Sequence, residues 1–271
     1  TGEGVEGWAV GDRVVGGLGT TGAFAERMVI PALSARRLPD GVSFEAVTGL
    51  NYAYGTTLYG LQHRADLQPG ETLLITGAGG AVGLSAVEIG KLMGARVIAA
   101  ASSDDKLDLC RERGADETIN YSTENLKDRA KELTDGNGVD VVYDCVGGDK
   151  AELALRAIGW EGRFLVIGFT AGIPSIPLNL ALLKSCQIIG VFYGAMTMRE
   201  PAKNAEISNQ LIEWVAASVT QTGRRRRTVA VQILMVLGET REPVLEVGVG
   251  EQSHADMQAR PCRPLRQAVV T

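Results

Sequence analysis

Cysteine and histidine are scarce in this chain, which limits the metal and disulfide chemistry open to it. The 271 residues include four cysteines and two histidines. The cysteines, Cys110, Cys145, Cys186 and Cys262, are widely spaced and form no CxxC pair. This spacing predicts neither a disulfide framework nor a zinc site. We therefore expect no bound metal and a reducing compartment.

Long apolar runs and a net positive charge are also missing. No run reaches the roughly 18 apolar residues that a membrane span needs, and no charged-then-apolar leader opens the chain. We therefore expect a cytoplasmic protein with no membrane partner. The formal net charge of −5 disfavours nucleic acid as a partner and favours small molecules. The chain also starts without methionine in a turn-rich β region, so we expect an upstream segment to be missing.

Three regions follow one another along the chain. Residues 1–55 contain short apolar runs bounded by glycines, then a Pro-Asp-Gly turn that opens a helix, which is typical of a β-rich domain. Residues 56–217 alternate apolar runs with helical segments, from "TLLIT" to "QIIGVFY". This alternation predicts a parallel sheet with helices on both faces, because parallel strands need right-handed crossovers.

The third region, residues 218–271, changes composition abruptly. Its lysine and arginine residues beyond Gln221 are all arginine, including "RRRR" at residues 224–227. The region shows neither a clear hydrophobic periodicity nor a regular pattern of turn residues. We expect a divergent, disordered tail. The arginine run is open to two interpretations, a nucleic-acid or nuclear signal and a solvated charged tail.

Local helix signals agree with the α/β interpretation. Gly94 follows "KLM" and Gly114 follows "CRER", where a left-handed residue ends a helix. Asp104 is predicted to cap the N-terminus of the helix that follows it.

A glycine-rich turn lies between an apolar strand and an amphipathic helix. Gly77, Gly80 and Gly83 give the spacing GxxGxxG, and Gly79 lies between the first two. Glycines here permit a tight turn, close approach of a pyrophosphate and tight packing of helix on strand. The helix that begins near Ala81 would direct free N–H groups at the phosphates. We predict a dinucleotide site that includes Gly77, Gly80 and Gly83; without a GK[ST] sequence, a P-loop is not expected.

The end of the second strand favours NADP(H) over NAD(H). An acid about 20 residues after the glycines would bind the ribose hydroxyls of NAD, but Ser102, Ser103 and Lys106 stand here instead. Hydroxyls and an ammonium group suit a 2′-phosphate. The alternative is that both serines are turn residues and Lys106 is solvated, and the nearby Asp104 and Asp105 count against phosphate binding.

Several motifs occur in a family's order. "GDRVVGG", "YGTTLYGL", "LQPGETLLITGAGGAVGLSAVEIGKLMGARVIAAASSDDKLDL", "GADETINY", "YDCVGGD", "EGRFLVIGF" and "IIGVFYG" together resemble the zinc-independent quinone oxidoreductases of the medium-chain dehydrogenase/reductase superfamily, in the quinone-oxidoreductase-like branch. The resemblance runs from about Gly2 to Ala217. It implies a Rossmann doubly wound sheet plus a partial GroES-like β-barrel domain, bound NADPH and a homodimer joined edge to edge.

The resemblance also assigns cofactor contacts. It places Gly77, Gly80, Ala81 and Val82 at the pyrophosphate; Ser102, Lys106 and Tyr121 around the 2′-phosphate; Val146, Phe169 and Phe192 near adenosine or nicotinamide; and Thr56 near the nicotinamide. Thr57 replaces the family's usual alanine. Each residue also has a structural interpretation: Val146 as a strand end, Phe169 and Phe192 as core aromatics, and Tyr121 as a packing residue.

The expected activity is zinc-independent transfer of hydride from NADPH to a quinone or an activated enone. The proton would come from water or a tyrosine, and Tyr54 is the candidate, although it could equally lie in the seam between domains. Two departures from the family, the missing first barrel strands and the arginine-rich tail, leave alternatives open. These are an NADPH-binding protein without catalysis, such as a sensor or an RNA-associating relative, and an inactive truncated product.

Overall fold

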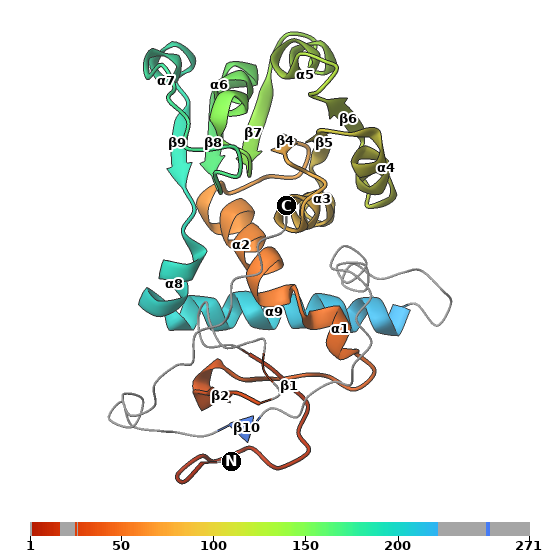
Figure 1. Cartoon of the computed structure of the whole chain (residues 1–271), viewed down its shortest axis with the longest axis vertical. Coiled ribbons are helices and arrows are strands. Elements are labelled where there is room, and N and C mark those ends of the chain that lie inside the picture. The colour runs from red at the N-terminus through yellow and green to blue at the C-terminus, as the bar shows by residue number, and fades with distance from the viewer. Residues whose placement is uncertain (1, 17–24, 26, 222–247, 250–271) are drawn as a thin grey trace, which may run out of the picture. The chain divides into compact units, whose positions relative to one another are not determined.

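A computed structural model of the chain describes residues 2–16, 25, 27–221 and 248–249. The described residues divide into two compact units, the first drawn from Thr1–Arg37 and Pro243–Thr271 and the second from Leu38–Glu242 (Figure 1). The "RRRR" run and nearly all of the predicted tail lie outside the described residues.

The first unit consists of short strands. Strand β1 (Val14–Val15) pairs antiparallel with β3 (Arg36–Arg37), and β2 (Val29–Ile30) pairs in parallel with β10 (Gly248–Val249). A short 3-10 helix, η1 (Ala32–Ser34), lies between β2 and β3. This unit thus contains short paired strands, and a partial GroES-like β-rich domain over residues 1–55 stays a prediction.

The second unit begins with a series of short helical elements. They are α1 (Phe44–Val47), the π-helical η2 (Leu50–Tyr54), α2 (Gly55–Leu58) and the π-helical η3 (Tyr59–Arg64). The helix predicted after the Pro-Asp-Gly turn is confirmed as α1, and Gly41 of that turn has a φ of 82°.

A six-stranded parallel sheet follows, in the order β6-β5-β4-β7-β8-β9. Its strands are β4 (Thr72–Thr76), β5 (Arg96–Ala101), β6 (Glu117–Asn120), β7 (Val139–Asp144), β8 (Ile158–Val166) and β9 (Gln187–Gly190). The predicted doubly wound parallel sheet is confirmed. This strand order places the reversal of winding between β4 and β7, the position at which such sheets bind ligands.

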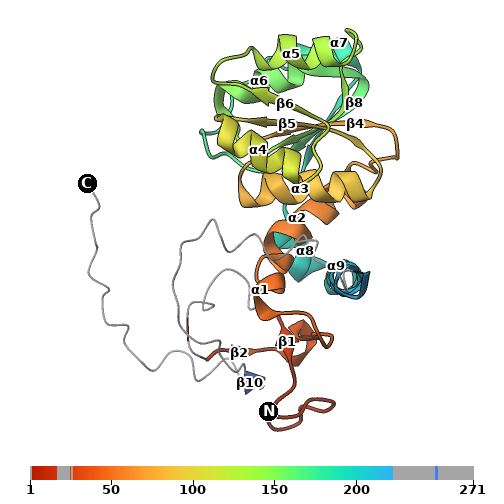
Figure 2. The same cartoon turned by 90° about the vertical axis from the view of Figure 1, so that its right-hand side faces the viewer.

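Helices cover both faces of this sheet, as Figure 2 shows. Helices α3 (Ala81–Leu92) and α4 (Asp104–Glu112) lie on one face. The opposite face is covered by α5 (Leu126–Leu133), α6 (Gly148–Ala157) and α7 (Asn179–Lys184). After β9 the chain forms α8 (Tyr193–Arg199) and the long α9 (Pro201–Gln221).

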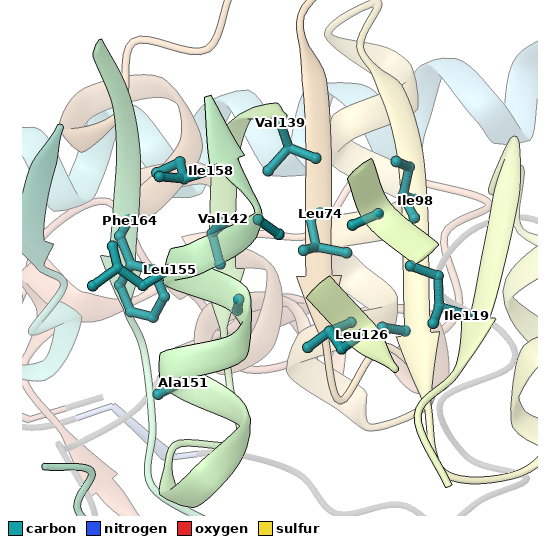
Figure 3. Close-up of a cluster of buried hydrophobic side chains, with 14 of the residues drawn as sticks. Leu74, Ile98, Ile119, Leu126, Val139, Val142, Ala151, Leu155, Ile158 and Phe164 are labelled. Carbon is teal, nitrogen blue, oxygen red and sulfur yellow. The ribbon is translucent and has the colours of Figure 1, made fainter. Parts of the chain in front are cut away.

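The main core cluster lies between the sheet and the helices α5 and α6 (Figure 3). Leu74, Ile98 and Val142 from three neighbouring strands pack there against Leu126 of α5 and Leu155 of α6. Because each of these side chains is fully buried, each contributes about 1.5–3 kcal/mol by leaving water. This core fixes the strands whose carboxyl ends carry the site.

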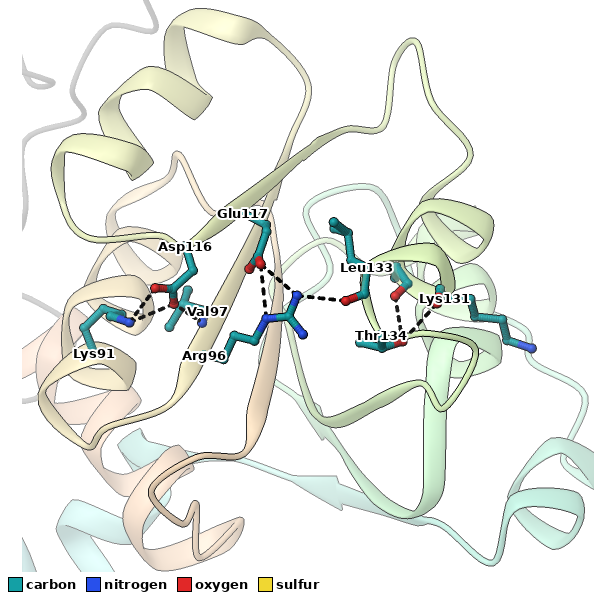
Figure 4. A network of polar contacts seen from close by, with 9 residues as sticks. Lys91, Arg96, Val97, Asp116, Glu117, Lys131, Leu133 and Thr134 are labelled. Carbon is teal, nitrogen blue, oxygen red and sulfur yellow. Dashed lines mark hydrogen bonds and ion pairs between the residues drawn. The ribbon is translucent and has the colours of Figure 1, made fainter.

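A polar network ties β5 to β6 at the amino end of the sheet (Figure 4). The Arg96 guanidinium donates to Glu117 at 2.7 Å and to the Leu133 carbonyl at 2.8 Å. The Lys91 ammonium contacts both oxygens of Asp116, at 2.7 and 2.8 Å. These contacts secure the edge opposite the predicted cofactor site.

The helix ends test the local sequence signals. Gly94 and Gly114 have φ values of 83° and 103°, which confirms the predicted left-handed ends. The predicted cap at Asp104 is wrong: Ser103 occupies the N-cap position and Asp104 is the first helical residue. Its carboxylate accepts a hydrogen bond from the Asn120 amide at 2.8 Å. A partner from the neighbouring strand β6 thus replaces the local capping bond.

Candidate functional site: the switch point of the sheet

The carboxyl ends of β4 and β7 lie side by side where the sheet reverses its winding. Thr76, the last residue of β4, pairs with Asp144, the last residue of β7. The helices that follow, α3 and α6, leave toward opposite faces (Figure 2). Divergent helices leave a crevice outside the strand ends, and open α/β sheets bind nucleotides there.

The glycine-rich turn after β4 has the backbone that such a crevice requires. Gly77 has a φ of 65°, in the left-handed region that disfavours side chains. A Cβ on Gly83 would lie 2.3 Å from the Gly77 carbonyl oxygen and 2.7 Å from the Ala78 Cα. Glycine at these two positions therefore lets α3 pack directly against the turn that precedes it.

The first turn of α3 faces this crevice without a side-chain cap. The N-cap residue is Gly80, which has no side chain to accept a bond from the helix. The N–H groups at the start of a helix lack intrahelical acceptors and form the positive end of its dipole. Gly80 and Ala81 are exposed, and Val82 is half-buried. This helix start can bind an anion.

Beside the turn lies a polar cluster at the end of β5. The aliphatic stem of Lys106 packs against Gly79, where a Cβ would lie 2.6 Å from the lysine Cβ. The Lys106 ammonium lies 3.4 Å from the Ser102 hydroxyl, and the Ser122 hydroxyl donates to the Ser102 carbonyl at 2.9 Å. The structure thus brings Ser102 and Lys106 together next to the glycines, with Ser103 half-buried at the adjacent N-cap.

Tyr121 lies next to this cluster. It follows β6, and Ser102 lies near its hydroxyl. Burial raises the pKa of this tyrosine, although the nearby Ser102 side chain opposes the shift. The Lys150 ammonium lies 5.4 Å from the centre of the Tyr121 ring. Lys150 could not be singled out from the sequence, because no local pattern distinguishes a lysine in the first turn of a helix.

The remaining predicted cofactor residues lie at the ends of other strands or outside the sheet. Val146 follows β7, is buried and packs against Gly77. Phe169 follows β8 beside Gly147, and Phe192 follows β9; both are exposed. Thr56 lies on α2 and is half-buried. Phe169 and Phe192 are therefore not core aromatics, whereas Val146 contacts the glycine turn directly.

Known proteins were compared with the chain. Residues 81–215 match the family described as zinc-binding dehydrogenase. A quinone oxidoreductase-like protein 2 homolog of Nematostella vectensis is 42% identical over 206 residues, which are 75% of this chain and 56% of that protein. The quinone oxidoreductase of Salmonella typhimurium is 35% identical, over 80% of this chain and 67% of its own length.

Solved structures give the same result. The Escherichia coli quinone oxidoreductase complexed with NADPH matches with a TM-score of 0.70 and 31% identity, covering 80% of this chain and 67% of that one. The chain belongs to the quinone-oxidoreductase-like family of the medium-chain dehydrogenase/reductase superfamily. It is homologous to quinone oxidoreductases, and it spans about half the length of the Nematostella relative, 56%.

In this member of the family, Asp144 organises the turn at the end of β7. Its carboxylate accepts a hydrogen bond from the Thr76 hydroxyl and from the backbone N–H groups of Val146 and Gly147, at 3.1 and 3.3 Å. The side chain is buried. Asp144 thereby links the two loops of the crevice, a role that the acid of "YDCVGGD" could have suggested.

Tyr54, the predicted catalytic residue, lies in the interior next to α3. Its hydroxyl donates to Glu88, whose other carboxylate oxygen accepts from Arg113 at 2.5 Å. Burial raises the pKa of Glu88, against the hydrogen bonds from Tyr54 and Arg113. Tyr54 is 3% exposed. The acceptor of the Tyr54 hydroxyl is therefore a buried carboxylate on α3.

A cluster of three buried hydroxyls fixes α2 beside the crevice. Thr57 Oγ1 lies 2.6 Å from Ser85 Oγ and 2.9 Å from the Tyr143 hydroxyl. Ser85 also donates to the Val82 carbonyl at 2.8 Å. These residues join α2, α3 and β7, so the position of Thr56 follows that of its neighbour Thr57.

Among the described residues, no group of three or more His, Cys, Asp or Glu side chains is arranged to hold a metal ion. None of the described helices combines the length and apolar character required to span a membrane.

Proposed function

We propose that this chain carries the cofactor-binding part of an NADPH-dependent, zinc-independent oxidoreductase that reduces a quinone or an activated enone. The observation that carries the proposal is the position of two anion-binding features at one switch point. The uncapped start of α3 follows Gly80, and Ser102, Lys106 and Tyr121 are in contact beside it. A dinucleotide with a 2′-phosphate carries negative charge at both places.

The residues fit this cofactor. Gly77 and Gly83 leave room for a backbone approach to a pyrophosphate. Asp104, which counted against phosphate binding, is engaged by the Asn120 amide at 2.8 Å. When bound, NADPH would supply a hydride, which carries both electrons and one of the two hydrogens of the reduction, and the second hydrogen would enter as a proton.

The chain's own contribution to this reaction is binding and orientation. Thr56, held by the Thr57 cluster, and Val146 line the nicotinamide side in this proposal, and the exposed Phe169 and Phe192 offer apolar surface to a flat substrate. The required proton comes from water in this proposal, because the Tyr54 hydroxyl already donates to Glu88. Hydride goes to a quinone oxygen or to the β-carbon of an enone, and the proton goes to the oxygen or to the α-carbon.

A homodimer is part of the proposal. Strand β9 is an edge strand among the described residues, and it exposes 38% of Ile188. Leu182 and Leu183 on the preceding helix α7 are also exposed. An open strand edge with apolar neighbours can pair with a second copy of the same strand.

The cellular location is proposed as the cytoplasm. Cys110, Cys145 and Cys186 are all free thiols in the described structure. Free thiols persist where glutathione and thioredoxin keep proteins reduced. Cys262 lies outside the described residues.

The experiment that tests the function is a fluorescence titration of the purified chain with NADPH and, in parallel, with NADH, followed by assays with quinones and enones. Tighter binding of NADPH and NADPH oxidation that depends on substrate would support the proposal. Binding without turnover, in folded protein, would instead support a non-catalytic nucleotide binder. Failure to bind either dinucleotide would mark the chain as an inactive piece of the family fold.

A further inference from the structure

A second lysine lies at the predicted phosphate cluster. Lys150 is half-buried on the first turn of α6, directly after the turn that follows β7. Its ammonium nitrogen lies 3.4 Å from the Tyr121 carbonyl oxygen and 5.4 Å from the centre of the Tyr121 ring. The first contact is a hydrogen bond and the second is within the range of a cation–π interaction.

Tyr121 connects Lys150 to the rest of the cluster. Its side chain packs against the main core, and its hydroxyl lies near Ser102. Ser102 in turn lies 3.4 Å from the Lys106 ammonium. Contacts therefore run from Lys150 through Tyr121 and Ser102 to Lys106, across the carboxyl ends of β7, β6 and β5.

The charges of this cluster favour an anion. Neither Lys106 nor Lys150 forms an ion pair with any residue that the structure describes. Asp104, the first residue of α4, directs its carboxylate at the Asn120 amide. Two ammonium groups without carboxylate partners, one beside the Ser102 hydroxyl and one over the Tyr121 ring, form a site suited to a phosphate monoester dianion.

We propose that Lys150 is a specificity-determining residue for the 2′-phosphate of the dinucleotide, an inference that rests on the proposed function. Lys150 adds the second positive charge of the phosphate site, and its ammonium holds the Tyr121 ring so that the hydroxyl stays at Ser102. NADH lacks the 2′-phosphate, so Lys150 contributes to the affinity for NADPH alone.

The test compares dissociation constants for NADPH and NADH in Lys150→Gln, Lys150→Arg and Lys203→Gln proteins. Lys203 is the charge-matched control, because it lies on α9, outside the sheet, and its ammonium contacts Glu200 at the end of α8. We expect Lys150→Gln to weaken NADPH binding about tenfold, the loss of one charge-assisted contact, and to leave NADH binding within about twofold. Lys150→Arg should keep the preference, since arginine also carries a cation that stacks on aromatic rings.

The contrary outcomes separate the two proposals. Equal weakening of NADPH and NADH binding by Lys150→Gln would mean that Lys150 only maintains the structure of the site, and it would overturn this inference. An unchanged NADPH preference in Lys150→Gln would also overturn it, while the NADPH-dependent function stands. A wild-type chain that binds NADH as tightly as NADPH would overturn both.

Discussion

The hydroxyl of Tyr54 donates a hydrogen bond to the carboxylate of Glu88, and both side chains lie in the interior of the second unit. Arg113 contacts the same carboxylate at 2.5 Å. The three side chains join η2, α3 and the end of α4. Removing any one of them leaves a buried polar group with fewer partners, which is costly in a low-dielectric interior.

Tyr54→Phe should therefore affect stability rather than chemistry. We expect the free energy of unfolding to fall by about 1–3 kcal/mol, because a buried carboxylate loses one donor, and kcat to stay within about twofold. Urea unfolding and steady-state NADPH oxidation measure the two quantities. Tyr52→Phe is the control, since Tyr52 is 74% exposed. A fall of kcat by about a hundredfold, with unchanged stability, would restore Tyr54 as a proton donor.

Two alanine substitutions separate packing from binding in the glycine turn. Gly83→Ala places a Cβ 2.3 Å from the Gly77 oxygen, so we expect unfolding to become easier by about 1–3 kcal/mol. Gly80→Ala brings its Cβ only to 3.4 Å from the same oxygen, so its cost should be at most about 1 kcal/mol. Gly80→Ala should nevertheless weaken NADPH binding, measured by titration; wild-type affinity would remove this position from the cofactor site.

Asp116 makes the stability of the β5–β6 edge depend on pH. Burial alone would raise the pKa of Asp116, but hydrogen bonds from Lys91 and the Val97 N–H outweigh it and lower the pKa below its usual value. A lowered carboxyl pKa stabilises the fold above the unfolded value of about 3.9, and this contribution disappears as the pH falls through the folded value.

The corresponding experiment compares urea unfolding of wild type and Asp116→Asn at several pH values. We expect the free energy of unfolding to be lower in Asp116→Asn by only about 1 kcal/mol at neutral pH. The effect is small because the Lys91 and Asp116 side chains are 34% and 36% exposed, so solvent screens the pair. The difference should shrink below about pH 4. A difference that grows as the pH falls would contradict the assigned direction.

Strand β9 gives a test of the proposed dimer. We expect the wild-type chain to have the mass of two copies in light scattering, and Ile188→Lys to have the mass of one, because lysine on an edge strand opposes pairing. Leu92→Lys is the control, since Leu92 is also exposed but lies on α3, away from this edge. Identical masses for wild type and Ile188→Lys would exclude pairing through β9.

Periodicity and glycine placement were sufficient to predict the sheet and its helices. Apolar runs such as "TLLIT" lie on strands buried from both faces, and Gly94 and Gly114 end helices because each adopts a positive φ. The cap at Asp104 was missed because its competing partner, Asn120, lies sixteen residues away on β6. Tyr54 and Glu88 are 34 residues apart, and no local pattern reports such a pairing. No sequence pattern marks Lys150 either, because its contact with Tyr121 depends on how α6 packs beside the end of β6.

The three hydroxyls of Thr57, Ser85 and Tyr143 have a consequence for how this sequence can change. Thr57 is the shared partner of the other two, and all three are closed to solvent. Ser85 also donates to the Val82 carbonyl, so alanine at position 57 alone would strand the Tyr143 hydroxyl, whereas alanine at 57 with phenylalanine at 143 would leave no such group stranded. The cost of a second substitution here therefore depends on the first, so mutational paths through these positions are ordered rather than independent.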